Sequence, residues 1–207
     1  MENELRIVGY LDDGSEYNDY RENLEEYVNL VLVENCNTIE DILSWILDNR
    51  PECLVVDHKL TTKYNFLGTD AVSFINKHIP DLPCIIITNY KNDSMQENLV
   101  MEMLIKERDD LPGNDGDFAE FGNQLKQACE VFSKRLNKRE EEYKYLYNKK
   151  QNEKLSAEEE ENLLYTYKIL KNYGELDDIP LSFFTSNISE QMDALLNKLD
   201  KHFSTED

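Results

Sequence analysis

Five polar residues have the types and the order needed for phosphate chemistry. Asp12 and Asp13 are adjacent, and Asp57, Thr88 and Lys106 follow along the chain. Three carboxylates at close range repel one another unless a cation lies among them or a pKa rises. Oxygen ligands with open positions suit Mg²⁺. With the metal and Lys106 neutralising charge, Asp57 could attack a phosphorus atom and hold the phosphoryl group as an acyl phosphate.

Short apolar runs predict the strands that position these residues. Their length and β-branched content are typical of strands buried on both faces. The carboxyl ends of parallel strands share one edge of a sheet, where ligands collect. Because each candidate residue ends such a run, the candidates should converge at that edge. The expected strands are Leu5 to Leu11, Val28 to Val33, Cys53 to Val56, Cys84 to Ile87 and Val100 to Ile105.

Helix-like segments alternate with these runs and predict an α/β fold. The repeated strand-helix order, with right-handed crossovers, indicates a doubly wound five-stranded parallel sheet. Thr38 begins a capping pattern, and Pro80 ends a helix that opens at Gly68. The expected helices are Asn18 to Tyr27, Thr38 to Asp48, Gly68 to His78 and a short Ser94 to Leu99.

The composition changes after Lys106, and the remaining chain is predicted to be helical. Residues 107–117 have the Pro, Gly and Asp content of an exposed loop. We therefore expect an α/β domain over residues 1–117 and a helical region over 118–207. The helical region should contain a long helix 118–150, a helix 156–173 folded back as a hairpin, and an amphipathic helix 188–203. Six hairpin tyrosines could pack its arms together or form an interface.

The ordered set of residues resembles the receiver domain of two-component response regulators, which has a flavodoxin-like fold. The resemblance covers residues 4–106, and also the helix from Phe118 if it serves as the fifth helix. It implies that Asp12 and Asp13 bind Mg²⁺, with Asp57 and the backbone carbonyl of Lys59 as further ligands. It also implies that Asp57 accepts phosphate, Thr88 bonds the phosphoryl oxygen and Lys106 pairs with it.

Several positions depart from the receiver pattern. Glu107 follows Lys106 where the family usually has proline, and Met103 stands where an aromatic switch residue is usual. The stretch from Asp57 to Gly68 is longer than usual, and the stretch from Thr88 to Lys106 is shorter. These departures leave the acceptor chemistry intact but predict weak or altered switching. We interpret His58 as a solvent-facing loop residue, with ordering of water for dephosphorylation as its functional alternative.

Composition excludes several classes of partner. The formal net charge is −21 and the pI is near 4.5, which disfavours nucleic acids and acidic membranes. No apolar run could span a membrane, and the N-terminus does not read as a signal peptide, so we expect a cytosolic protein. The isolated cysteines and histidines do not have the spacing of a zinc site; we expect reduced core cysteines. The cysteines are Cys36, Cys53, Cys84 and Cys129, and the histidines are His58, His78 and His202.

These observations favour a signalling receiver that takes phosphate from a histidine kinase or phosphotransfer protein. Its output would be protein contact with an unknown downstream partner or a second copy bound through the helical region, not DNA binding. We expect no enzyme activity beyond possible autophosphatase activity. One alternative is a phosphorylation-independent pseudo-receiver that acts as an interaction or scaffold module. A less favoured one is an aspartyl-nucleophile phosphatase, because Asp57 follows the third strand and not the first.

Overall fold

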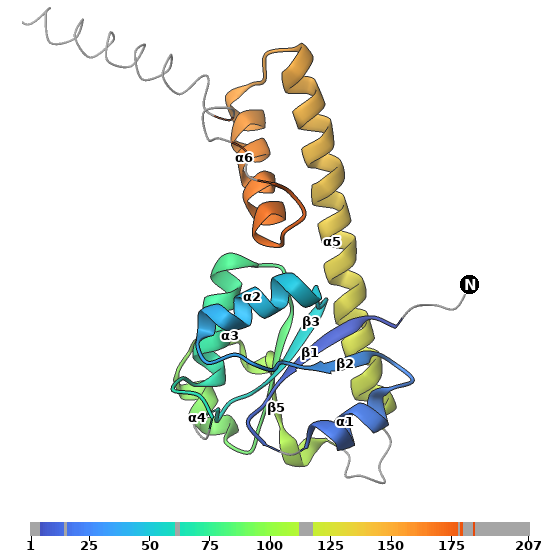
Figure 1. Cartoon of the computed structure of the whole chain (residues 1–207), viewed down its shortest axis with the longest axis vertical. Coiled ribbons are helices and arrows are strands. Elements are labelled where there is room, and N and C mark those ends of the chain that lie inside the picture. Colours follow the sequence, from blue (N-terminus) through green and yellow to red (C-terminus); the bar gives the residue numbers. More distant parts are fainter. Residues whose placement is uncertain are drawn as a thin grey trace, which may run out of the picture. The chain divides into compact units, whose positions relative to one another are not determined.

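A computed structural model describes residues 5–14, 16–60, 63–111, 118–177, 179 and 184. Five parallel strands form one sheet in the order β2-β1-β3-β4-β5 (Figure 1). This is the flavodoxin-like order, so the predicted fold class is confirmed. The strands are β1 (Ile7–Leu11), β2 (Asn29–Leu32), β3 (Cys53–Asp57), β4 (Cys84–Thr88) and β5 (Ile105–Glu107).

Helices cover both faces of the sheet. On one face, α1 (Tyr17–Leu24) and the first turns of α5 (Ala119–Asn152) contribute Tyr20, Leu24 and Phe121 to a buried core with Val8 and Val55. On the other face lie α2 (Ile39–Asn49) and α3 (Gly68–His78). Alternate residues of each strand point to opposite faces, which is why the strands are apolar throughout.

Local signals explain where the helices begin. Thr38 accepts from the backbone N–H of Asp41, whose side chain accepts from the N–H of Thr38, so the predicted capping box is present. The connection between β4 and β5 holds only a short helix, α4 (Lys91–Gln96), which begins and ends three residues earlier than predicted.

The fifth strand differs from the prediction. Residues 100–105 were expected to form it, but Glu102–Leu104 form a 3₁₀ turn and the strand is Ile105–Glu107. Thr88 of β4 pairs with Glu107 in the ladder. The apolar run at 100–105 was misleading because Met101 and Met103 are 64% and 77% exposed. As a result, Lys106 lies within β5, and Arg108 is the first residue after it.

The chain divides into two compact units, residues 1–137 and 138–207. The division falls inside α5 because the first half of this helix buries Phe121, Leu125 and Cys129 in the core of the first unit. The sheet unit therefore includes the first half of α5, a helix that the sequence analysis assigned to the C-terminal region.

The second unit contains the predicted hairpin, made by the last turns of α5 and by α6 (Ala157–Asn172). Tyr143 stacks on Tyr167 with ring centroids 6.4 Å apart, and both are buried. Tyr145 and Tyr165 are exposed. Ser156 caps α6 in the predicted capping box. Three of the six hairpin tyrosines, Tyr143, Tyr167 and Tyr173, thus serve packing.

The cysteines lie where the sequence analysis expects them. All four are free and buried, as predicted. The expected helix 188–203 lies outside the described residues. Within the described ranges, none of the helices has a stretch apolar enough and long enough to cross a bilayer.

Gly68 fixes α3 against the end of β3, and its replacement should be costly. A Cβ at this position would lie 2.1 Å from the backbone carbonyl oxygen of Asp57, so a backbone segment would have to move. We expect Gly68→Ala to lower the free energy of unfolding by about 2–4 kcal/mol in urea denaturation. Gly14→Ala is the comparison, because the nearest atom to its Cβ would be the Oδ1 of the Asp12 side chain at 3.3 Å. Equal losses would contradict this account.

Candidate functional site

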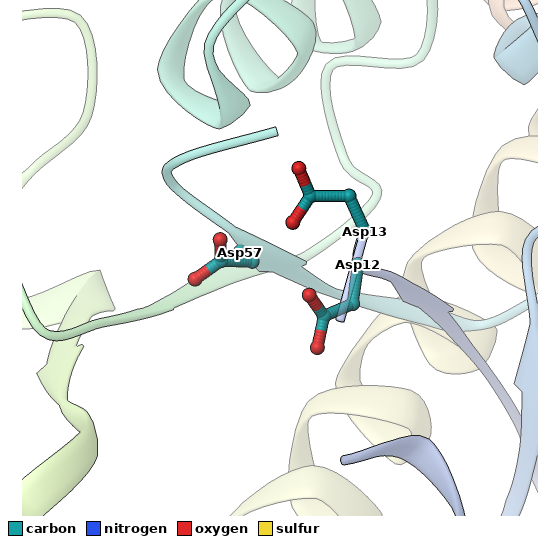
Figure 2. A group of neighbouring side chains, drawn as sticks. All are labelled: Asp12, Asp13 and Asp57. Carbon is teal, nitrogen blue, oxygen red and sulfur yellow. The ribbon is translucent and has the colours of Figure 1, made fainter. Parts of the chain in front are cut away.

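Three carboxylates meet at the point where the strand order reverses, between β1 and β3. Asp12 and Asp13 directly follow β1, and Asp57 is the last residue of β3 (Figure 2). One oxygen from each lies within 4.8 Å of the others. Doubly wound sheets place their ligands in this crevice. The structure therefore brings together the three acidic residues singled out in the sequence.

Asp12 is held in place by its neighbours. It is buried, with Oδ2 accepting from the Tyr10 hydroxyl at 2.7 Å and Oδ1 accepting from the Gly14 N–H at 2.9 Å. Burial and the charge of Asp12 raise the pKa of Tyr10, so its hydroxyl keeps the proton it donates. Each carboxylate oxygen has a second lone pair that remains available to a cation.

The environment of Asp57 disfavours its ionised form. Its side chain is only 12% exposed. Burial, followed by the charges of Asp12 and Asp13, raises the pKa of Asp57 to about 6. Hydrogen bonds from the backbone of His58 and Lys59 act in the opposite direction but do not cancel the rise. The ionised form of Asp57 is therefore less favoured in the folded protein than in the unfolded chain.

The cation that contacts Asp57 is Arg108. Its Nη2 lies 2.9 Å from Asp57 Oδ1, and its Nη1 forms an ion pair with Glu16, at the start of α1. The side chain of Arg108 is 16% exposed. Sequence reasoning missed this residue because it placed the end of the fifth strand two residues early. Arg108 is the first cation after the observed strand 105–107, so a correct strand boundary would have singled it out.

Lys106 is not joined to Asp57 by an ion pair, nor to any other carboxylate in the described part of the chain. It lines a hollow of about 850 Å³ bordered by α4, β5 and the start of α5. Exposed Met103 lines the same hollow, together with Ile105 and Phe121. Met103, which stands where the receiver pattern has an aromatic switch residue, is therefore not packed into the core.

Thr88 is fully buried at the end of β4. Its hydroxyl oxygen accepts from the Tyr90 N–H at 2.9 Å. The ammonium group of Lys59 lies 3.1 Å from the centroid of the Tyr90 ring, a cation–π contact between the segments that follow β3 and β4. These contacts connect the two strand ends that carry Asp57 and Thr88.

His58 is buried, which corrects the expectation of a solvent-facing loop residue. It is 2% exposed, and its Nε2 lies 3.9 Å from Glu97 Oε1. Burial lowers the pKa of His58, so the ring is neutral near pH 7. Glu97 also accepts a hydrogen bond from Thr69, near the start of α3. The ring is thus directed at Glu97.

The acidic cluster fits a hard divalent cation. Carboxylate oxygens are the ligands preferred by Mg²⁺, and a cation would relieve the repulsion that raises the pKa of Asp57. The residues that would hold it are Asp12, Asp13 and Asp57. The backbone carbonyl of Lys59 stays a predicted ligand.

The sequence matches no family model and no curated protein. Solved structures do match. A CheY-like receiver domain protein from Methanospirillum hungatei is 16% identical over 63% of this chain and 98% of its own, with a TM-score of 0.46. The receiver domain of a putative Luxo repressor from Vibrio parahaemolyticus is 21% identical over 60% and 92%, with a TM-score of 0.42.

A third solved structure covers more of the chain. The response regulator RcsB from Salmonella typhimurium is 16% identical over 89% of this chain and 98% of its own, with a TM-score of 0.45. That structure is described in terms of its DNA interaction. The present chain has the flavodoxin-like fold by its own strand order and register.

The raised pKa of Asp57 predicts a pH-dependent stability without metal. As pH rises from about 4 to about 6, the folded protein must lose a proton that the unfolded chain has already lost, so stability falls. Asp57→Asn mimics the neutral form and should gain about 1–2 kcal/mol over the wild type above pH 6, after allowance for solvent screening. Urea denaturation at pH 4.5 and 7 measures this difference. Asp48→Asn, on the exposed face of α2, keeps Asp57 and should lose stability between the two pH values as the wild type does.

Mg²⁺ should stabilise the protein through the same carboxylates. A ligand at tenfold its dissociation constant adds about 1.4 kcal/mol, which corresponds to a rise of roughly 3–6 °C in Tm. We expect this rise for the wild type and its loss in Asp12→Asn and Asp57→Asn. Asp19→Asn removes one charge from the exposed face of α1 and should retain the rise. An equal rise in all four proteins would place the metal elsewhere.

Proposed function

We propose that this protein is a response-regulator-like signalling protein that accepts a phosphoryl group on Asp57 with the help of Mg²⁺. The observation that carries the proposal is the meeting of Asp12, Asp13 and Asp57 within 4.8 Å, at the reversal point of a flavodoxin-like sheet. A buried hydroxyl, Thr88, ends the adjacent strand, and a guanidinium contacts the acceptor. The donor is a histidine kinase or a phosphotransfer protein.

The chemistry follows from the charges at the site. An oxygen of ionised Asp57 forms a bond to phosphorus while the bond from phosphorus to the donor atom breaks, and the electron pair leaves with the donor. Mg²⁺, when bound, offsets negative charge on the phosphoryl oxygens. Asp12 is fixed by Tyr10 and Gly14, so it holds its position without reorganising.

The output is protein contact through the helical region, by dimerisation or through a partner, and not DNA binding. Lys149 and Lys150 at the end of α5 are paired with Glu159 and Glu160 of α6, which removes two cations from any phosphate backbone. Exposed Tyr145 and Tyr165 offer apolar area with a polar end. The protein acts as a phosphoacceptor and not as an enzyme that turns over small phosphate esters.

Two observations favour the alternative of a phosphorylation-independent module. Met103, at the position of the aromatic switch residue, is 77% exposed, and α4 has only six residues. In this alternative the acidic cluster is kept for its fold and the sheet unit serves as a platform. It predicts that Asp57 never carries phosphate.

Intact-mass measurement separates the two functions. We expect incubation with acetyl phosphate and Mg²⁺ to add one phosphoryl mass to the wild type and none to Asp57→Asn. Removing Mg²⁺ with a chelator should reduce the adduct at least about tenfold. Asp48→Asn, on α2, should be phosphorylated like the wild type. Absence of an adduct with both acetyl phosphate and a phosphorylated phosphotransfer protein would favour the platform, and continuous release of phosphate from small esters would favour a phosphatase.

A further inference from the structure

We infer that Arg108, and not Lys106, is the side chain that holds the transferred phosphoryl group at Asp57, and that Glu16 keeps it in place beforehand. This inference rests on the proposed function of Asp57. The observation behind it is the pair of contacts that Arg108 makes, with Nη2 at 2.9 Å from Asp57 Oδ1 and Nη1 on Glu16.

The position of Arg108 follows from the ladder of β5. Thr88 pairs with Glu107, so the residue that directly follows the ladder beside the end of β4 is Arg108. Lys106 pairs with Ile87, which also pairs with Asp57, so Lys106 lies level with the acceptor but two strands away. Its side chain lines the hollow beside Met103 and Phe121 and forms no ion pair with Asp57. Of these two cations, Arg108 is the one that contacts the acceptor.

The chemistry of the guanidinium suits this task. Arginine presents several N–H donors in a planar fork, stays charged, and can contact two oxygens of a phosphoryl group at once. The Nε–H of Arg108 is buried and has no hydrogen-bond partner among the described residues, so the side chain keeps a donor for another oxygen. A phosphoryl group on Asp57 would supply such oxygens.

Glu16 holds the Arg108 side chain in the unphosphorylated protein. It is 43% exposed and precedes α1, whereas Arg108 is 16% exposed. By pairing with Nη1, Glu16 orders a long side chain over Asp57 before any phosphate arrives. A phosphoryl group carries more charge than one carboxylate, so it competes with Glu16 for the same guanidinium. Phosphorylation should thereby loosen the contact between Arg108 and the start of α1.

The inference predicts effects of opposite sign on metal binding and on phosphorylation. Arg108 places a positive charge beside the carboxylates, so Arg108→Ala should tighten Mg²⁺ binding, by about three- to tenfold. The same variant should lose at least about tenfold in the adduct formed with acetyl phosphate. A variant that merely folded badly would lose both. The measurements are Mg²⁺ titration by calorimetry and adduct formation by intact mass, on the full chain.

Three further variants complete the test. Arg108→Lys should recover part of the adduct, Glu16→Gln should lower it by about two- to fivefold, and Lys106→Ala should leave both measurements unchanged. If the wild type forms an adduct that Lys106→Ala abolishes and Arg108→Ala retains, the assignment to Arg108 is wrong while the proposed function stands. If the wild type forms no adduct, the proposed function fails and this inference fails with it.

Discussion

Like charge confined at one edge of a sheet is the constraint on which the rest of this site depends. Asp12, Asp13 and Asp57 lie within 4.8 Å of one another because they stand at the ends of β1 and β3, which pair up to Leu11 and Val56. The resulting repulsion is reduced in two ways. The guanidinium of Arg108 contacts Asp57. The pKa of Asp57 is also raised to about 6, so this carboxyl group stays protonated to a higher pH than an ordinary aspartate. Both measures are partial, because neither gives the cluster the charge of a divalent cation. A site built in this way favours binding of positive charge.

Much of this arrangement could be predicted from the sequence because it depends on local sequence patterns, each of which indicates one kind of structure. Four strands and the helix at 68–78 follow from apolar runs bounded by caps and by Pro80. Asp12, Asp13 and Asp57 were found because they end such runs, and the edge they share is a property of parallel sheets. The capping boxes at Thr38 and Ser156 were likewise local, since each needs only four residues.

The rest could not be predicted because it depends on register and on long-range contacts. The run from Val100 to Ile105 has strand composition, yet Met101 and Met103 face solvent and only Ile105 joins the sheet. The sequence also singled out Lys106, which lies level with Asp57 in the ladder, whereas the cation in contact with Asp57 is Arg108. Sequence position alone also gave no reason to bury His58, whose ring is enclosed by segments from α3 and α4. Ladder pairing decides such matters, and one sequence does not reveal it.

The hydrogen bond from the Gly68 N–H to the His58 carbonyl, 2.8 Å long, closes the base of the segment that follows Asp57. A segment with a fixed neck can change length at its tip while the acceptor stays where it is, because closure entropy grows only with the logarithm of loop length. The chain thus has room for insertions beside its most sensitive residue. Sequence changes in this segment would alter the surface that a partner protein contacts, without changing the position of Asp57.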